Sequence, residues 1–480
     1  MLLCLALAFS CLAVHADGEY RMLWVDAYRH GFRTPQDVDM LLNVARTVNY
    51  NAVVVEVRKV CDAFYNSSVE PKSRTIDAAF DPLAYLIRRA HDTTGGNRRI
   101  EVHAWLVTYR CRVPNDDTWR DPRHVFQRHP DWLSQMRDGS QSEAKNSERA
   151  GWFHLDPGVP QVVDHIVEVV RDLLSNYDVD GITFDYLRYP ESKGGGNQWG
   201  YNPTAVARFN TLYGRTGRPA ADDPQFCEFR RQQIRFLLRK VYAHVRAWRP
   251  LVKVSAALIA WGGVANGFEN TDAYGIVMQD WLSMAQAGFL DIMLPMNYKR
   301  ESVASQAVDF RGWTQFLAAV ARQTGRFGVN VVDGESLNTL DGVLAQVRVT
   351  RNTAGLAGVS TYSYGDCRKD TTGIPDAVFY NAVRKQLFPT PAPVPEPIWL
   401  TRPTEGWVKG VVASGNRVID GAVVRIGNQC ALTDGSGFYA FARVRPGTYR
   451  LRVEYSGRVL AEEVVDIQAG KVVDKNVIVR

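Results

Sequence analysis

Short strand-like runs alternate with amphipathic helical patterns eight times between residues 19 and 388, and this alternation most constrains the fold. The apolar runs lie at 20–25, 52–57, 100–107, 181–185, 252–259, 291–297, 327–332 and 358–362. Helical periodicity follows them at 35–48, 82–91, 160–177, 224–248, 276–287, 302–323, 337–353 and 376–387. This order predicts an α/β fold, an eight-stranded parallel β/α (TIM) barrel. A doubly wound sheet is less favoured, because no glycine-rich phosphate loop follows the first strand.

The composition changes after residue 388. Prolines alternate with other residues from Pro389 to Pro397, so residues 389–403 predict an extended linker of polyproline II type. Residues 404–480 consist of short alternating runs with Gly and Pro between them, which predict a small all-β sandwich. Because the linker is stiff, we expect two self-contained cores, and a barrel that stays folded when the residues after Phe388 are deleted.

The first sixteen residues are apolar and end in Val14-His15-Ala16, which is typical of a signal-peptidase site, although a basic amino-terminal region is missing. We therefore expect residues 1–16 to be a signal peptide and the protein to be secreted or extracytoplasmic, in the periplasm or cell envelope. A lipoprotein anchor at Cys11 is less favoured, because Ala8-Phe9-Ser10 is a poor lipidation box. No later apolar run is long enough to span a bilayer.

Charge and cysteine content exclude several classes of partner. The net charge of +6 is spread along the chain, which favours an ordinary solvated surface over nucleic-acid binding. Neither a CxxC pair nor a His pair at metal-ligand spacing follows the leader, so we expect no metal and no cofactor. Cys61 and Cys111 come shortly after neighbouring predicted strands, and we expect a disulfide between them at one rim of the barrel.

Several motifs, in order, resemble the glycosyl hydrolase-like 10 family. They are EVHAWLVTYR at 101–110, HPDWL at 129–133, the segment LDPGVPQ to LRYP at 155–190, and FLDIMLPMNY at 289–298. The resemblance implies a bacterial barrel protein related to glycoside hydrolases and associated with cell-envelope glycans. The tail resembles the carboxypeptidase regulatory-like, transthyretin-like domain through TDGSGF at 433–438 and PGTY at 446–449. That second resemblance implies an accessory module and not a catalyst.

The chain departs from the family pattern at four strand ends. The family motif QVRPxGDALY becomes EVRKVCDAFY, with Glu56 in place of Gln while Asp62 is kept. Asp185 matches the first acid of FDDYFYP, and Tyr186 replaces the second. AWFNPYR becomes AWLVTYR, and PQxY becomes PMNY with Met296.

Carboxylates at strand ends are the catalytic candidates, because glycosidic bond cleavage usually needs two carboxyl groups and barrel active sites lie at this face. Asp185 ends the fourth predicted strand; its alternative role is a loop cap bonded to Arg188. Asp62, just past the second strand, is our choice for the second carboxylate, with an ordinary solvated loop acid as the alternative. Glu56 is as well placed, although pairing with either of the two cations that follow it would make it structural.

Sugar binding needs flat apolar faces and planar hydrogen-bonding groups. The predicted substrate-binding residues are Arg58, Tyr109, Arg188, Asn297, Tyr298 and Tyr364. Trp105, inside the third strand, is expected to belong to the core, and His103 to be a satisfied buried histidine.

Two classes of function are compatible with these residues. The first is an exported glycoside hydrolase that cleaves O-glycosidic bonds of a polysaccharide by carboxylate acid/base chemistry, with peptidoglycan glycan strands as one candidate substrate. The second is a non-catalytic glycan-binding protein of the cell envelope on a degenerate barrel. A glycan partner is expected in both cases, and the sequence gives no indication of oligomeric state.

Overall fold

The computed structural model describes residues 18–29, 31–143, 150–192, 197–334, 336–365 and 376–479. Within them, eight parallel strands close into a barrel in the order β1-β10-β9-β8-β7-β6-β3-β2, which confirms the predicted architecture. The barrel strands are β1 (Tyr20–Val25), β2 (Ala52–Arg58), β3 (Glu101–Val107), β6 (Gly181–Asp185), β7 (Lys253–Ile259), β8 (Ile292–Met296), β9 (Phe327–Asp333) and β10 (Gly358–Tyr362). The expected leader at 1–16, with Cys11, and also Cys367, lie outside the described residues.

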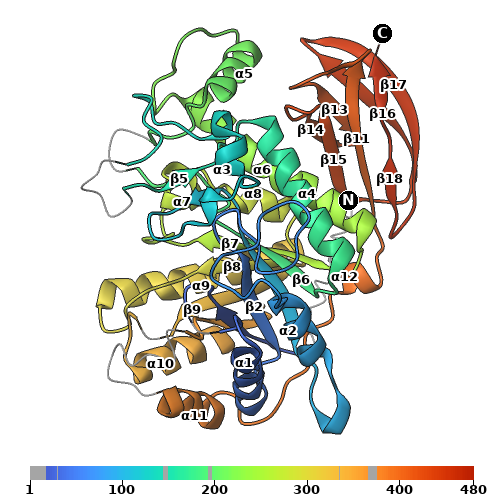
Figure 1. Cartoon of the computed structure of the whole chain (residues 1–480). Coiled ribbons are helices and arrows are strands. Elements are labelled where there is room, and N and C mark those ends of the chain that lie inside the picture. Colours follow the sequence, from blue (N-terminus) through green and yellow to red (C-terminus); the bar gives the residue numbers. More distant parts are fainter. Residues whose placement is uncertain are drawn as a thin grey trace, which may run out of the picture.

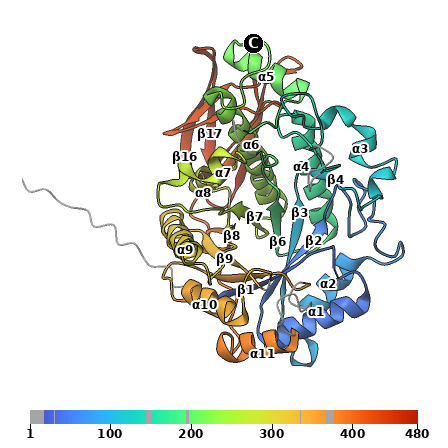
Figure 2. The ribbon, with the colours of Figure 1, turned by 90° about the vertical axis from the view of Figure 1, so that its left-hand side faces the viewer.

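Helices cover the outer face of the barrel (Figures 1 and 2). The long ones are α1 (Pro35–Val48), α2 (Pro82–His91), α4 (Pro160–Asn176), α5 (Pro203–Tyr213), α6 (Pro224–Trp248), α9 (Ala304–Thr324), α10 (Leu340–Arg351) and α11 (Asp376–Gln386). Their starts follow from local chemistry. At α6, for example, the Asp223 side chain accepts hydrogen bonds from the N–H groups of Gln225 and Phe226, and Pro224 occupies the first turn.

One predicted helix is shorter than expected. The segment predicted at 276–287 becomes helical only at α8 (Trp281–Gln286), because Met278 has a φ of 58° and the Asp280 side chain caps the N–H of Ser283. The pattern also missed α5, which packs on the first turns of α6, and short elements in the long loops. The short elements are η1 (Thr94–Gly96), β4 (Arg110–Arg112), η2 (Thr118–Arg120), α3 (Val125–Arg128), η3 (Pro130–Trp132), β5 (Phe153–His154), η4 (Phe268–Asn270) and α7 (Asp272–Gly275).

Alternate residues of the strands fill the barrel interior, as side chains of period two must. Near the carboxyl ends of the strands, Trp24 and Trp105 meet edge to face with ring centroids 4.9 Å apart, so Trp105 packs in the core as expected. The ring centroids of Tyr362 and Tyr298 lie 5.5 Å apart, and both residues are partly exposed. These rings form an aromatic layer below the loops that carry the candidate site.

The tail folds as two sheets that face one another, as predicted for a sandwich. One sheet holds β11 (Gly406–Ser414), β12 (Arg417–Val418), β15 (Phe438–Val444), β18 (Val472–Asp474) and β19 (Val477–Val479). The other holds β13 (Val423–Ile426), β14 (Gln429–Leu432), β16 (Gly447–Tyr455) and β17 (Arg458–Ile467). Strands β18 and β19 pair with β11 in parallel, and the remaining pairs are antiparallel.

The sandwich has an apolar cluster of its own, as expected for a self-contained core, but it also lies against the barrel, which the sequence did not indicate. Figure 1 shows its red sheets beside α6. The Arg239 guanidinium donates to the carbonyls of Leu432 and Phe438 at 2.8 and 3.1 Å. Arg208 forms a bidentate ion pair with Asp420 at 2.8 and 3.1 Å. The apolar cluster outside the barrel also takes in residues of the sandwich, Trp407 and Ala442.

The proline-rich segment is also bound to the barrel. The N–H of Glu19 donates to the carbonyl of Pro393 at 3.0 Å, and Asn51 donates to that of Ala392 at 3.1 Å. After it, in α12 (Ile398–Thr401), the Trp399 ring packs 4.7 Å from that of Phe327 and its Nε1–H donates to Asp291 at 2.7 Å. Trp399 therefore covers the amino-terminal end of the barrel.

No helix among the described residues has both the length and the apolar character needed to cross a membrane.

Candidate active site

Asp185 is the last residue of β6 and lies at the carboxyl end of the barrel strands. Its Oδ1 accepts the backbone N–H of Tyr186 at 2.6 Å. Its backbone carbonyl accepts both the N–H and the hydroxyl of Thr108, each at 2.7 Å. Burial raises the pKa of the Asp185 carboxyl, while the Arg188 and Arg110 guanidinium groups oppose that shift. The carboxyl is thus held rigidly at the face where barrel enzymes carry out their chemistry.

Glu56, near the end of β2, is a second buried carboxyl at this face. Its Oε2 accepts the N–H of Ala27 at 2.8 Å, and the residue is only 1% exposed. Burial raises the pKa of Glu56 to about 8, with Arg110 acting in the opposite direction. The cations that follow it are engaged elsewhere: Arg58 with Glu70 at 2.7 Å and Lys59 with Asp116 at 2.6 Å. Glu56 is therefore not neutralised by them, and its pKa keeps it protonated at neutral pH.

Arg110 contacts Glu56 and acts electrostatically on Asp185, and the sequence did not single it out. Its Nη2 lies 3.8 Å from Glu56 Oε1. Burial alone would lower the pKa of Arg110, but Tyr186, Tyr28, Glu56 and Asp185 raise it above its ordinary value. Its guanidinium charge favours the ionised form of both carboxyl groups.

Tyr186 occupies the position where the family pattern has a second acid. Its ring centroid lies 4.4 Å from the Arg110 guanidinium carbon and 4.5 Å from that of Arg188. The Arg188 guanidinium carbon also lies 5.2 Å from the ring centroid of Trp261, two residues after β7, and Arg188 Nη1 lies 3.7 Å from Glu191 Oε1. Tyr186 has a φ of 49°, a left-handed conformation that is uncommon for such a residue and typical of functional loops. The predicted substrate-binding residue Arg188 thus lies beside Asp185.

Asp62 has a different environment. Its Oδ1 accepts the backbone N–H groups of Lys59 and Val60 at 3.1 and 2.9 Å, and the residue is fully buried. These contacts close the turn after β2, as Asp side chains often do. They favour a structural role for Asp62 and leave Glu56 as the better-placed partner of Asp185.

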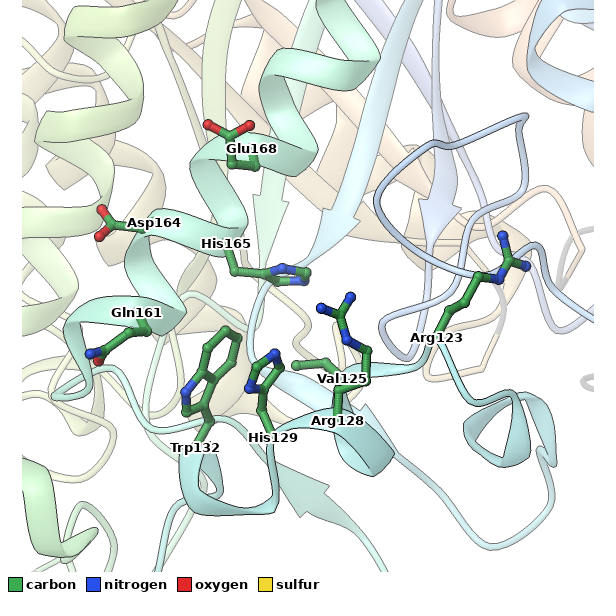
Figure 3. Close-up of a pocket in the computed structure, with 9 residues that line it drawn as sticks. All are labelled: Arg123, Val125, Arg128, His129, Trp132, Gln161, Asp164, His165 and Glu168. Carbon is green, nitrogen blue, oxygen red and sulfur yellow. The ribbon is translucent and has the colours of Figure 1, made fainter.

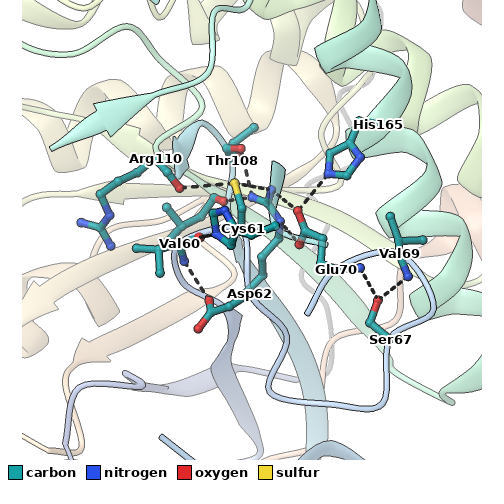
Figure 4. Close-up of polar contacts among 12 residues, drawn as sticks. Val60, Cys61, Asp62, Ser67, Val69, Glu70, Thr108, Arg110 and His165 are labelled. Carbon is teal, nitrogen blue, oxygen red and sulfur yellow. Dashed lines mark hydrogen bonds and ion pairs between the residues drawn. The ribbon is translucent and has the colours of Figure 1, made fainter. Parts of the chain in front are cut away.

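A buried polar network connects the loop after β2, at Glu70, with helix α4, at His165 (Figure 4). Arg58 binds both oxygens of Glu70 at 2.7 Å and donates to the carbonyls of Val107 and Thr108. His165 of α4 contacts Glu70 at 2.9 Å. Burial alone would raise the pKa of Glu70, but Arg58 and His165 lower it to about 2. Arg58 therefore fixes the end of β3 next to Asp185 and faces the protein interior, where it is 1% exposed.

His165 also lines a surface pocket of about 330 Å³ outside the barrel (Figure 3). In it, His129 stacks on Trp132 with ring centroids 3.8 Å apart and an interplanar angle of 6°. The HPDWL motif thus builds this pocket and not the strand-end site.

The other predicted substrate-binding residues have mixed positions. Tyr298 follows the carboxyl end of β8 and belongs to the partly exposed aromatic layer, where a sugar ring could stack. Tyr109 and Tyr364 are each 1% exposed and belong to the apolar cluster. Asn297 is fully buried and donates to the carbonyl of Phe310 at 3.0 Å. Tyr298 therefore lies in the aromatic layer, and Arg188 lies beside Asp185.

Cys61 and Cys111 are buried free thiols, so the disulfide expected from the sequence is not formed in this structure. They are nevertheless neighbours: burial raises the pKa of Cys61, and a hydrogen bond with Cys111 adds to the shift. The Arg58 guanidinium donates to Cys61 Sγ at 3.0 Å, which fixes this thiol within the polar network.

In the described part of the chain, no group of three or more His, Cys, Asp or Glu side chains is arranged to hold a metal ion. His103, expected to be a satisfied buried histidine, contacts Glu101 at 3.0 Å through Nε2. What the strand ends do offer is a protonated carboxyl and a second carboxyl with a guanidinium beside them, a set suited to acid–base chemistry.

Comparison with known proteins identifies the family. The sequence profile described as glycosyl hydrolase-like 10 matches residues 19–321, more than half of the chain. The chain belongs to this family. Residues 408–480 match the carboxypeptidase regulatory-like domain. Strands β9 and β10, which close the barrel, lie beyond the first match.

Similar proteins carry glycosyl hydrolase names. The chain is 25% identical over 388 residues to glycosyl hydrolase YngK of Bacillus subtilis, an alignment that covers 76% of this chain and 69% of that one. It is 26% identical over 283 residues to glycosyl hydrolase DigH of Escherichia coli K12, covering 54% of this chain and only 57% of DigH.

Solved structures show the same fold. The glycoside hydrolase domain of PgaB (BpsB) from Bordetella bronchiseptica superposes with a TM-score of 0.55 at 17% identity, over 77% of this chain and 99% of that domain. The catalytic domain of β-amylase from Paenibacillus polymyxa gives a TM-score of 0.50 at 13% identity, over 79% of this chain and 100% of that domain.

Proposed function

We propose that this protein is a glycosidase that cleaves O-glycosidic bonds of a polysaccharide, with Glu56 and Asp185 as its two carboxyl groups. The observation that carries the proposal is the placement of both carboxyls at the carboxyl ends of β2 and β6 with Arg110 beside them. Family membership and the glycosyl hydrolase names of similar proteins support the same reaction class.

The two carboxyl groups have different environments, which suits different roles. Because the pKa of Glu56 is raised to about 8, its carboxyl holds a proton at neutral pH and can donate it to the leaving oxygen. Burial also raises the pKa of Asp185, but two guanidinium groups and one backbone N–H oppose that shift and favour the ionised form of the carboxyl. We assign to Asp185 the role of nucleophile, or of base for the attacking water.

Peptidoglycan glycan strands are the substrate we favour within this class, because the resemblance carried by the sequence motifs implies an association with cell-envelope glycans. Export, through the apolar residues 1–16, belongs to the same proposal. The mass of the amino-terminal peptide of the protein recovered from cells tests this part: cleavage after Ala16 is expected, and a retained Met1 on the bulk of the protein contradicts it.

Activity is tested by incubating the purified protein with peptidoglycan, stripped glycan strands and a panel of other polysaccharides. New reducing ends are expected from at least one substrate, and co-sedimentation of the protein with the insoluble ones is measured in parallel.

A non-catalytic glycan-binding protein is the second candidate, favoured by Tyr186 at the position of the family's second acid. Co-sedimentation without new reducing ends on any substrate would favour this candidate. Neither binding nor cleavage would contradict both.

A further inference from the structure

A cavity of about 650 Å³ lies at the amino-terminal end of the barrel, opposite the candidate active site. Phe327 and Gly358, the first residues of β9 and β10, line it together with Trp399 from α12. The last turns of α9 and α10 complete the wall. Its volume falls in the range of about 300 to 1,000 Å³ that is usual for small-molecule sites.

The polar side of this cavity is strongly basic. Its charged lining residues are Glu19, Arg322, Arg326, Arg348 and Arg351. Arg351 pairs with Glu19 at 2.5 and 3.1 Å. Arg322 donates to the carbonyl of Ala354 at 2.7 Å and Arg348 to Gln386 at 2.6 Å, both neutral acceptors. Within the described part of the chain, three of the four arginines therefore have no acidic partner.

Of the four arginines that line the cavity, Arg326 is the one whose position is not accounted for by interaction with a helix dipole. Arg322, Arg348 and Arg351 lie in the last turns of α9 and α10, where cations interact favourably with the helix dipole. Arg326 instead lies between Gly325, which ends α9, and the first residue of β9.

The Arg326 side chain is also poorly compensated. The residue is 7% exposed, and among the described residues its contacts are a 3.5 Å hydrogen bond to the Gly325 carbonyl and the Trp399 ring at 4.6 Å. Its Nε–H has no hydrogen-bond partner there. A buried guanidinium is costly unless it is paired, so this arrangement indicates an anion that completes it.

We propose that the cavity binds an amphipathic organic anion, whose phosphate or carboxylate group contacts Arg326. The guanidinium fork matches the geometry of both anionic groups. The apolar part of the ligand packs on Phe327, Trp399 and Leu356, which line the same cavity. This site is separate from the glycosidase proposal and stands or fails without it.

Titration calorimetry of the full chain tests the proposal with four probes: octyl phosphate, octanoate, inorganic phosphate and octyl glucoside. We expect octyl phosphate or octanoate to bind at least about tenfold more tightly than octyl glucoside, which has the same chain and no charge. Inorganic phosphate should bind more weakly than octyl phosphate, because it makes no use of the apolar wall. Preference for one of the two anionic probes then decides between a phosphate and a carboxylate ligand.

Variants locate the binding. Arg326→Gln should weaken the affinity for the tighter-binding anionic probe by at least about tenfold. Arg450 is an exposed arginine of the sandwich, and Arg450→Gln should leave that affinity unchanged. Arg322 and Arg348 are exposed at the rim of the cavity, so their variants test the site if Arg326→Gln fails to fold. Arg322→Gln and Arg348→Gln should each weaken binding of the anionic probe about threefold. No binding of either anionic probe up to about 10 mM, or binding that none of these three changes affects, would overturn the proposal.

Discussion

At the scale of single residues, Glu56 couples the stability of the fold to pH. Its carboxyl has a pKa of about 8 in the folded protein, against an ordinary value of 4.5. The folded state therefore disfavours ionisation, and stability present below pH 4.5 is lost as the pH rises towards 8. A shift of this size corresponds to at most about 5 kcal/mol.

Glu56→Gln should remove that dependence, because the amide can still accept the N–H of Ala27 and carries no charge at any pH. We expect the variant to lose less unfolding free energy than wild type between pH 5 and pH 9, by several kcal/mol, in urea titrations at both values. Asp39→Asn, an exposed acid of α1, serves as the control and should follow wild type. Parallel losses in wild type and Glu56→Gln would show that Glu56 does not hold its proton in the folded state.

The sequence could indicate Asp185 and Glu56 because strand ends can be recognised from apolar runs. It could not indicate Arg110, which lies three residues past β3 and meets Glu56 only because the barrel places β2 beside β3. Arg58 was predicted to bind substrate, which is not supported, because its contacts also depend on how distant residues fold together. Its partner Glu70 lies 12 residues away, and only the folded loop shows that the pair is buried.

At the scale of elements, the Arg58, Glu70 and His165 contacts tie the loop after β2 to α4 and to the end of β3. Removing the charge of Glu70 leaves a buried guanidinium without its counterion, so Glu70→Gln should lower the unfolding free energy by about 3 to 5 kcal/mol. Glu168 lies on α4, one turn after His165, and is about half exposed. Glu168→Gln should therefore change the unfolding free energy by less than about 0.5 kcal/mol. Equal effects of the two changes in urea unfolding would contradict the role given to the network.

Strands were better predicted than helix starts. The eight barrel strands are recognisable because they are buried on both faces and rich in apolar residues. The start of α8 was misplaced by five residues, since the apolar residues 276–278 satisfy the helical pattern, whereas the left-handed backbone of Met278 prevents helix there.

At the scale of the whole molecule, the sandwich and the segment that leads to it stabilise the barrel. Composition alone predicted a stiff spacer between two cores, because proline spacing shows that a segment is extended and does not show what it lies against. Truncation after Phe388 removes Trp399 from the barrel end and exposes α6, so we expect a clear fall in melting temperature or aggregation. A chain that ends at residue 404 keeps Trp399 and should be more stable than the shorter one.

The barrel alone therefore is not expected to behave like the full chain. Equal melting temperatures of the full chain and of the chain truncated after Phe388 would contradict this view and restore the expectation of independent cores. Trp399→Ala in the full chain isolates the ring itself, and we expect a loss of about 2 to 4 kcal/mol in unfolding free energy for this partly buried aromatic.

The most direct test of the account is the turnover of Asp185→Asn and Glu56→Gln on the glycan that gives most reducing ends. Asp62→Asn, in the loop that follows the strand of Glu56, serves as the control. Because Asn can accept the N–H groups of Lys59 and Val60 in place of Asp62, the control should keep kcat within about tenfold of wild type. Asp185→Asn and Glu56→Gln should each lose at least about 10²-fold in kcat while still binding the glycan. Wild-type turnover by either of them, or a larger loss in Asp62→Asn than in Glu56→Gln, would contradict the assignment of Glu56 and Asp185 as the catalytic pair.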